Sequence, residues 1–348
     1  MRAVLLLGHG GLDRLAVVHD HPRPVPGEGE VLVRVGACAV NATDVNTRVG
    51  WYAQGDDNGA WDEPLRFPRI QGADVCGTVV AVGPGVDAVT AGALLDRRVM
   101  VDPWLRDPAD PWSLDHTGYV GSEIDGGYAE YVVVPAANAH PVQSALTDAE
   151  LASFATSTGT ALNMLERVQV GADDTVLVTG ASGGVGAALV QVARLRGATV
   201  VAVSTAAKAD GVRALGARVV LDRALPLAAQ LVAATGRASV DVVADVVGGA
   251  EWPGLVDLLR RGGRYVVSGA VAGPHVALDL RTLYLRDLVL AGTAVQPPGL
   301  FARLVEHVER GDIVPTVSAV YRFDQVREAQ AAFLERHHVG KIVLSGWA

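Results

Sequence analysis

The sequence has little cysteine and no long apolar run. Its two cysteines, Cys38 and Cys76, are too few for a disulfide framework, and they cannot by themselves make a tetrahedral zinc site. We interpret both as core residues and expect a cytoplasmic protein. No stretch of 18 apolar residues is present, and the apolar run after Met1 is too short for a signal peptide. The sequence therefore argues against a disulfide-stapled secreted protein and against membrane-spanning helices.

Lysine is also rare, and the charge balance is acidic. Aspartate and glutamate total 38 against 29 lysines and arginines, which gives a formal net charge of −9. A surface that is negative on balance repels phosphate, so we expect neither nucleic acid nor a membrane as partner. Only Lys208 and Lys341 among the 29 basic residues are lysines. We interpret these two isolated ammonium groups as candidates for contact with a cofactor.

Glycine and apolar residues, by contrast, are plentiful. Half of the chain (50%) is hydrophobic, and 348 residues predict about two domains. Glycine contributes 40 residues, which exceeds the ~7% of average usage, and no triplet repeat accompanies it. The excess is therefore expected in turns and in loops that approach a ligand closely.

The pattern of the chain changes near residue 141. Residues 1–140 contain short alternating strands broken by glycine and proline, which predict a β-rich domain. Residues 141–294 repeat a strand, glycine, helix pattern with nearly continuous apolar strands, which predicts a parallel sheet covered by helices on both faces. Residues 295–348 return to mixed helix and strand. We therefore expect a nucleotide-binding domain at 141–294, inserted into a domain made of 1–140 and 295–348.

The sharpest motif is a turn of small residues after the apolar strand at 176–178. Such residues let backbone N–H groups and a helix N-terminus approach a pyrophosphate, and Gly186 permits close packing of the helix on the strand. The strand before and the helix after are the context in which such glycines bind a dinucleotide. A tight turn without a ligand is the alternative. The predicted cofactor-binding residues of the turn are Ala181, Ser182, Gly183, Gly184, Val185 and Gly186.

The end of the second parallel strand indicates which dinucleotide is bound. An NAD site would carry an acidic residue there to bind the ribose 2′-hydroxyl, but the sequence has Ser204, Thr205 and then Lys208. A hydroxyl and an ammonium suit a 2′-phosphate, and no carboxylate repels it. We therefore predict NADP(H), with Arg213 as a weaker candidate for the phosphate. An ordinary solvated role for Lys208 is the alternative.

An ordered set of segments resembles a known superfamily. They are 27–35 (GEGEVLVRV), 41–44 (NATD), 72–77 (GADVCG), 126–135 (GGYAEYVVVP), the Gly180 turn and 340–344 (GKIVL). With this set the chain resembles the medium-chain dehydrogenase/reductase superfamily, in particular its zinc-free quinone oxidoreductase-like and alcohol dehydrogenase-like branch. The resemblance implies an α/β protein with a GroES-like β-rich catalytic domain and a Rossmann-type doubly wound cofactor domain. It also implies an NADP(H)-dependent oxidoreductase.

The resemblance also bears on zinc. Zinc-dependent alcohol dehydrogenases of this superfamily carry three ligands at positions that match Asn41, Ala73 and Thr156 here. None of these residues supplies a thiolate or an imidazole, which are the ligands that zinc prefers. The superfamily's structural-zinc lobe is also missing, since residues 102–123 contain no cysteine. We therefore predict no metal.

Without a metal, hydride transfer needs hydrogen-bond donors where negative charge develops. The resemblance places the segment from Asn41 to Asp44 at the nicotinamide end of the cleft, and Tyr52 where enoyl reductases of the superfamily have a tyrosine. A phenol can donate a proton or a hydrogen bond to an oxyanion; a rim aromatic that only packs on substrate is the alternative. Thr43 matches a hydroxyl used for proton relay in alcohol dehydrogenases. Asp44 is interpreted as a carboxylate that fixes the loop, with an acid as the alternative.

Further cofactor residues are expected at the carboxyl ends of the later strands, where a nicotinamide ring would lie. They are Val247, Gly248, Ser268, Gly269 and Ala270. Lys341 resembles the superfamily's lysine near the cofactor phosphates or ribose. Aromatic residues in two irregular segments are candidates for an apolar rim around the substrate, with packing inside the loops as the alternative. They are Trp51, Trp61, Trp104, Trp112 and Tyr119.

These residues support one leading hypothesis and two alternatives. We predict an NADPH-dependent, zinc-independent reductase of an activated C=C bond or a quinone. The first alternative is a carbonyl reductase or alcohol dehydrogenase with the same cofactor, in which Thr43, Tyr52 or His116 supports the oxyanion. The second is a non-enzymatic NADPH-binding protein. Superfamily members pair the apolar strand at 288–295 across a two-fold axis, so a homodimer is expected.

Overall fold

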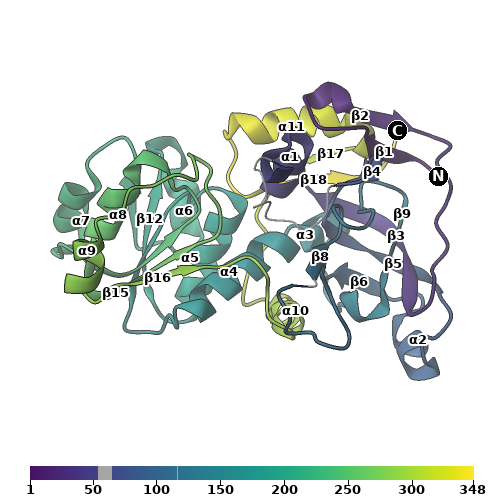
Figure 1. Cartoon of the computed structure of the whole chain (residues 1–348), viewed down its shortest axis with the longest axis horizontal. Helices are drawn as coiled ribbons and strands as arrows, with labels where there is room; N and C mark the ends of the chain where they lie inside the picture. The colour runs from purple at the N-terminus through teal and green to yellow at the C-terminus, as the bar shows by residue number, and fades with distance from the viewer. Residues whose placement is uncertain (54–64, 116) are drawn as a thin grey trace. The chain divides into compact units, whose positions relative to one another are not determined.

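The computed structural model describes residues 1–53, 65–115 and 117–348, and the chain forms two compact units. Unit 1 comprises Met1–Thr156 and Phe301–Ala348, and unit 2 comprises Ser157–Leu300. Unit 1 is β-rich and unit 2 contains a parallel sheet with helices (Figure 1), which confirms the predicted fold class. In the part of the chain that the structure describes, no helix is both long and apolar enough to cross a membrane.

Unit 1 is organised around a sheet whose strand order is β10-β6-β5-β3-β18-β17, with β9 also paired to β3. The yellow C-terminal strand β18 lies beside the purple β3 in Figure 1, and the two are antiparallel. The strands of unit 1 are β1 (Ala3–Leu6), β2 (Leu15–Val18), β3 (Glu30–Ala39), β4 (Arg69–Ile70), β5 (Asp74–Val82), β6 (Arg98–Val101), β7 (Trp104–Arg106), β8 (Thr117–Tyr119), β9 (Tyr131–Pro135), β10 (Ala139–Pro141), β17 (Val317–Tyr321) and β18 (Lys341–Ser345).

Short helices surround this sheet and close its core. Leu6, Val33, Tyr128, Phe323 and Leu344 are among the fully or almost fully buried core residues, so the first and last segments of the chain share one core. The helices are η1 (Leu12–Arg14), α1 (Ala42–Val49), η2 (Trp51–Ala53), α2 (Ala88–Leu94), η3 (Ala136–Asn138), α3 (Asp148–Ala152), α10 (Leu300–Arg310), η6 (Phe323–Gln325) and α11 (Val326–Glu335).

Unit 2 has a fully parallel sheet in the order β13-β12-β11-β14-β15-β16. Chain order reverses between β11 and β14, and ligands of open parallel sheets bind at the carboxyl ends of strands at such a switch point. Every residue of β11 and β14 is buried, which explains their largely apolar sequence. The strands are β11 (Thr175–Val178), β12 (Thr199–Ser204), β13 (Val219–Asp222), β14 (Val240–Asp245), β15 (Leu259–Val267) and β16 (Val289–Gly292), and the helices are α4 (Ala155–Arg167), α5 (Gly184–Leu195), η4 (Ala206–Lys208), α6 (Ala209–Ala214), α7 (Leu227–Thr235), η5 (Gly249–Glu251), α8 (Trp252–Asp257) and α9 (Leu280–Leu285).

The unit boundaries differ from those predicted. The sequence placed them at 140/141 and 294/295, whereas the compact units meet at 156/157 and 300/301. Helix α3 packs against β3, β5 and β18, so the chain stays with unit 1 until Thr156. Beyond residue 294, the Val295 carbonyl accepts a hydrogen bond of 3.1 Å from the Asn163 side chain, which keeps this segment with unit 2.

Strand β16 forms one edge of the unit 2 sheet. Val289 in this strand is exposed, so an apolar residue lies at an edge whose outer side has no paired strand among the described residues. Such an edge is a template for strand pairing. The homodimer stays a prediction, and the mass in solution by light scattering would test it.

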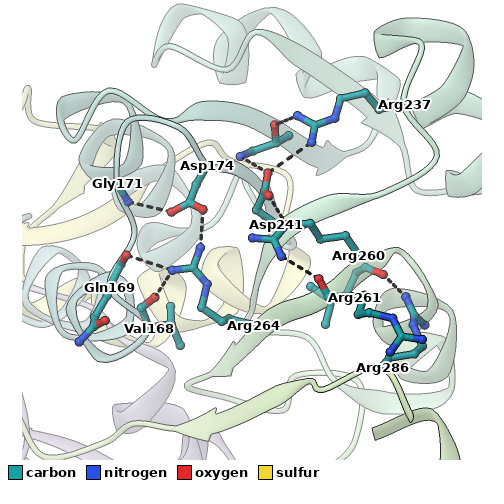
Figure 2. A network of polar contacts seen from close by, with 12 residues as sticks. Val168, Gln169, Gly171, Asp174, Arg237, Asp241, Arg260, Arg261, Arg264 and Arg286 are labelled. Atoms are coloured by element: carbon teal, nitrogen blue, oxygen red, sulfur yellow. Dashed lines mark hydrogen bonds and ion pairs between the residues drawn. The ribbon is translucent and has the colours of Figure 1, made fainter. Parts of the chain in front are cut away.

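Arginine side chains tie together the amino-terminal ends of the unit 2 strands (Figure 2). The Arg264 guanidinium in β15 donates to the carbonyls of Val168 at 2.7 Å and Gln169 at 3.0 Å, and it pairs with the Asp174 carboxylate. The first two residues follow α4 and the third precedes β11. Arg264 therefore joins β15 to the end of α4 and to the start of β11, which is separated from β15 by β14.

We expect Arg264→Met to destabilise unit 2 measurably. The variant leaves two carbonyls and a largely buried carboxylate without their donor, which costs about 2 kcal/mol in the free energy of unfolding. Arg281→Met is the control because Arg281 pairs with Asp279 in an exposed position, where an ion pair contributes little. Urea denaturation of both variants measures the difference. An equal effect of the two substitutions would contradict the prediction.

Candidate functional site

The small-residue turn of unit 2 lies between the end of β11 and the start of α5, as predicted. Gly180 adopts a positive φ of 56°, and a Cβ on Gly186 would lie 2.1 Å from the Gly180 carbonyl oxygen, so this close approach of helix and strand requires glycine. Gly183 caps α5 without a side-chain hydrogen bond. The first N–H groups of α5 therefore lack a side-chain acceptor, and such a helix end suits an anion.

The end of β12 carries the predicted 2′-phosphate residues. Ser204 is buried at the last position of the strand, and its hydroxyl has no hydrogen-bond partner among the residues that the structure describes. Thr205 caps η4, and Lys208 ends that short helix. Burial lowers the pKa of Lys208, and the neighbouring charge of Arg223 lowers it further. Two cations therefore lie at this edge of the sheet.

Arg223 was missed by the sequence reasoning, which named Arg213 instead. Arg213 forms an ion pair of 2.7 Å with Asp210, its neighbour on α6. Arg223 directly follows β13, and Asp222 at the end of β13 pairs in register with Ser204. A basic residue immediately after the neighbouring parallel strand was the signal that pointed to this position.

The turns after β14 and β15 are joined by backbone hydrogen bonds. Val247 and Gly248 follow β14, while Ser268, Gly269 and Ala270 follow β15. The Ser268 N–H donates to the Asp245 carbonyl at 3.2 Å, and the Ala272 N–H donates to the Val247 carbonyl at 2.8 Å. The structure therefore brings these five predicted residues to one edge of the sheet.

The buried carboxylate of Asp245 shapes these turns and was not predicted. It accepts hydrogen bonds from the Thr179 hydroxyl at 2.5 Å and the Tyr265 hydroxyl at 2.6 Å. It also accepts from the N–H groups of Val247 at 2.8 Å and Gly248 at 3.1 Å. Burial, and then Asp245 itself, raise the pKa of Tyr265. An aspartate at the end of a largely apolar buried strand was the available sequence signal, because such a charge needs several donors.

Unit 1 contains a second polar cluster where three strands meet. Asn41 follows β3, Asp74 begins β5 and Lys341 begins β18, and Ala39 of β3 lies opposite Asp74 in register. The Lys341 ammonium donates to the side-chain oxygen of Asn41 and, at 3.0 Å, to the Asp74 carboxylate. The Lys341 and Asp74 side chains are only 5% and 0% exposed. This geometry favours a role for Lys341 within the cluster over the predicted contact with the cofactor.

Asp44 fixes the start of α1. Its carboxylate accepts hydrogen bonds from the Asn41 N–H at 2.7 Å and from the Tyr128 hydroxyl at 2.9 Å. Burial raises the pKa of Asp44 to about 6, although both hydrogen bonds oppose this shift. The contacts agree with the interpretation of Asp44 as the carboxylate that fixes this loop.

The two remaining catalytic candidates are Thr43, in the first turn of α1, and Tyr52, shortly after the end of this helix. The Thr43 hydroxyl is buried and has no hydrogen-bond partner within the described ranges. Tyr52 lies in η2, and its hydroxyl accepts a hydrogen bond of 3.3 Å from the Asn46 amide. Burial is the main cause that raises the pKa of Tyr52, so this phenol keeps its proton at neutral pH. These properties suit a hydrogen-bond donor.

The predicted aromatic rim is only partly present. Trp104 and Tyr119 are buried and stack edge to face with ring centroids 4.9 Å apart, so Trp104 packs inside unit 1. Trp112 is 71% exposed and Trp51 is partly exposed. Trp61 and His116 lie outside the described residues. Tyr119, by contrast, directs its hydroxyl to the Thr156 hydroxyl at 2.6 Å, a contact that the sequence did not indicate.

The described residues include no group of three or more histidine, cysteine, aspartate or glutamate side chains that could hold a metal ion. Cys38 and Cys76 are both free and buried, and burial raises the pKa of each thiol. Thiols with raised pKa values are poor metal ligands and poor nucleophiles. The two cysteines are therefore core residues, as interpreted, while the absence of zinc stays a prediction.

Two family models match the chain. The model described as alcohol dehydrogenase GroES-like domain matches residues 27–144. The model described as zinc-binding dehydrogenase matches residues 184–310. The first match falls within unit 1, and the second covers most of unit 2 and continues into α10.

Several known proteins are similar to this chain over nearly its whole length. A solved structure, "putative alcohol dehydrogenase" from Sinorhizobium meliloti 1021, is 46% identical with a TM-score of 0.93 and covers 100% of this chain and 97% of its own. The acryloyl-coenzyme A reductase of Metallosphaera sedula is 28% identical over 99% of this chain and 100% of its own length. The human quinone oxidoreductase is 26% identical over 99% of this chain and 97% of its own length.

We expect Asp44 to make the protein less stable as the pH rises from about 4 to about 6. Because its pKa is raised to about 6, the folded protein holds a proton in this range that the unfolded chain has already lost. The free energy of unfolding of the wild type should therefore fall relative to that of Asp44→Asn, by up to about 3 kcal/mol. Urea denaturation at several pH values measures it. A constant difference between the two proteins from pH 4 to pH 7 would refute the expectation.

Proposed function

This chain belongs to the medium-chain dehydrogenase/reductase superfamily, and from that premise we propose that it transfers hydride from NADPH to an activated C=C bond or a quinone without zinc. The observation that carries the proposal is the end of β12. There the Ser204 hydroxyl, which has no partner among the described residues, and the cations of Lys208 and Arg223 replace the carboxylate of an NAD site. The substrate is a small molecule.

The residues of unit 2 fit a dinucleotide. The close approach at Gly186 and the start of α5 suit a pyrophosphate, because within the described ranges no side chain caps the first N–H groups of this helix. A phosphate on the ribose would be held by Ser204, Lys208 and Arg223 through charge-assisted hydrogen bonds. The bound nicotinamide supplies the hydride. The turns held by Asp245 supply the backbone edge against which its ring would lie.

The proposal of zinc independence rests on the residues at the three matching ligand positions. The Asn41 side-chain oxygen accepts from the Lys341 ammonium, Ala73 has no ligating atom, and the Thr156 hydroxyl bonds to Asp74. The Lys341 ammonium already occupies oxygen atoms of Asn41 and Asp74 that a metal ion would need. The donor set therefore suits an internal cation better than zinc, which prefers sulfur and nitrogen.

The reaction requires stabilisation of the charge that the hydride brings. Addition of hydride to the β-carbon of an activated C=C bond leaves an enolate, whose oxygen carries negative charge. The Tyr52 phenol, protonated and half-buried, is the proposed hydrogen-bond donor to this oxygen. A proton must then reach the α-carbon. The names of the acryloyl-coenzyme A reductase and quinone oxidoreductase relatives support this substrate class.

A carbonyl reductase or alcohol dehydrogenase is the second candidate. The name of the Sinorhizobium meliloti structure favours it. The Thr43 hydroxyl, which has no partner in the part of the chain that the structure describes, offers a further donor to an alkoxide. In both reactions the same cofactor gives hydride, and only the atom that receives it differs. A non-enzymatic NADPH-binding protein is the third candidate, and it predicts cofactor binding without turnover.

We expect Lys208→Ala and Arg223→Ala each to raise the Kd of NADPH about 10- to 100-fold. Each substitution removes one charge-assisted contact to the 2′-phosphate, which NADH lacks, so the Kd of NADH should stay within about twofold. Arg213→Ala is the matched control because Arg213 is already paired with Asp210. Fluorescence titration with both coenzymes measures the effect. Equal losses of affinity for NADPH and NADH would contradict the 2′-phosphate role.

We expect wild-type protein, dialysed against a chelator, to oxidise NADPH with enals, acryloyl thioesters or quinones. Tyr52→Phe should lower kcat for the enals about 100-fold, because it removes a donor to the developing oxyanion. Absorbance of NADPH measures turnover, and elemental analysis of the purified protein measures zinc. Activity confined to ketones and alcohols would favour the second candidate, binding without turnover the third, and stoichiometric zinc would overturn zinc independence.

A further inference from the structure

Tyr119, Thr156 and Asp74 form a hydrogen-bonded chain inside unit 1. The hydroxyl groups of Tyr119 and Thr156 are 2.6 Å apart, and the Thr156 hydroxyl bonds in turn to Asp74 Oδ1. The backbone N–H of Thr156 donates to the same carboxylate oxygen at 2.7 Å. Sequence reasoning gave none of these three residues a role in proton transfer.

The direction of the chain follows from its donors. A carboxylate accepts hydrogen bonds only, so Thr156 uses its single hydroxyl hydrogen toward Asp74. The Thr156 oxygen must then accept from the Tyr119 hydroxyl. Both hydroxyl groups therefore donate inward, toward the carboxylate, in the resting arrangement.

The inner end of the chain is an ammonium. Asp74 Oδ2 accepts from Lys341 at 3.0 Å, and Asn41 is the second partner of this ammonium. An isolated charge this deeply buried would be strongly unfavourable, so the Lys341 and Asp74 charges stabilise each other in the ionised form. Lys341 has a third donor hydrogen, and the structure gives it no further partner within the described ranges.

The outer end of the chain is held rigidly. Tyr119 lies opposite Trp104 in the β7–β8 pair, and its ring stacks on that indole. The backbone N–H of Trp104 donates to the Asp102 carboxylate at 3.0 Å. The Asn138 side-chain amide donates to the Trp104 carbonyl at 2.9 Å. Tyr119 is therefore a fixed group, which suits repeated proton transfer at one atom.

We propose that this hydrogen-bonded chain delivers the proton that follows hydride transfer. Tyr119 gives the proton to the substrate, and Lys341 is the group from which the proton is replaced. The proposal rests on the proposed function, which leaves the source of that proton open. Burial is the main cause that raises the pKa of Tyr119, followed by the charge of Asp74, so Tyr119 holds its proton until a stronger base is present. Asp44 and Tyr52 contribute to the same shift, which indicates that the Tyr119 hydroxyl lies near the other candidate groups.

The transfer balances with one proton and no further electrons. The hydroxyl groups turn outward, and Tyr119 gives its proton to the carbanion or alkoxide that the hydride has created. Tyr119 takes the Thr156 proton. Lys341 gives one proton to Asp74 and becomes a neutral amine, and the Asp74 carboxyl group then turns to pass this proton to Thr156 and becomes a carboxylate again. Water returns a proton to Lys341 after the product leaves. In the resting inward direction the same chain accepts a proton from an alcohol, so it serves both directions of a carbonyl reaction.

Interruption of the chain at its middle tests the proposal. We expect Thr156→Val to lower kcat at least about 100-fold while KM and the Kd of NADPH stay within about twofold, because proton transfer is lost and binding is not. Thr156→Ser should recover most of kcat, since it restores the hydroxyl. Thr160→Val is the matched control, one turn further along α4 and outside the chain. Tyr119→Phe should resemble Thr156→Val.

Two further readouts separate a proton path from simple packing. The solvent deuterium isotope effect on kcat should increase in Thr156→Val, in which proton transfer becomes rate-limiting, and should not change in Thr160→Val. Exchange-protected hydroxyl protons should be visible by ¹H NMR in the wild type and in Thr160→Val. The Thr156 proton should be absent from Thr156→Val, and the Tyr119 proton should be absent from Tyr119→Phe. Unchanged kcat and an unchanged isotope effect in Thr156→Val would overturn the proposal.

A failure of the proposed function would be recognised separately. If the wild type turned over no C=C, quinone or carbonyl substrate, the proton-delivery role would fall with the activity. The NMR signal would then show whether the hydrogen-bonded chain itself exists. If the wild type is active and the NMR signal is absent, only the proposal of proton delivery through the hydrogen-bonded chain is wrong.

Discussion

The ion pair between Lys341 and Asp74 is the interaction on which the arrangement of unit 1 depends. Both charges are almost completely removed from water, and an ion transferred alone to such a place costs several kcal/mol. The pair is therefore tolerated only if the starts of β5 and β18 stay side by side with the end of β3. Asn41, the third member, extends the same constraint to α1, which carries Thr43 and Asp44. One electrostatic requirement thus positions most of the candidate catalytic groups.

In unit 2 a single buried charge, the Asp245 carboxylate, has a comparable role. Asp245 is buried at the end of β14, and four donors from the strand ends and turns around it satisfy its carboxylate. This requirement shapes the backbone that follows β14 and β15. In both units a buried carboxylate organises the backbone at strand ends, and the proposed cofactor and substrate chemistry uses the groups that are held there. Stability and function therefore share the same residues, since an unsatisfied charge would disrupt both.

Local patterns in the sequence were sufficient for the small-residue turn between β11 and α5 and for the fold class. Glycine at 180 and 186 is required by backbone conformation and by close approach, and both constraints act within a few residues of each other. The apolar runs of β11 and β14 similarly reflect burial on both faces of one sheet. The interpretation of Asp44 could also be reached from sequence, because its partner Asn41 is only three residues away.

Other features depended on contacts between residues far apart in the chain. The sequence by itself determined the two types of unit, the small-residue turn after β11 and the unusual rarity of lysine. Only the tertiary structure decided that Lys341 meets Asp74 and Asn41, that Arg223 lies near Lys208, and that Tyr119 reaches Asp74 through Thr156. Periodicity and motif spacing report on local backbone geometry and on which faces are buried. The partner of a buried charge is set instead by strand order and register, which one sequence does not reveal.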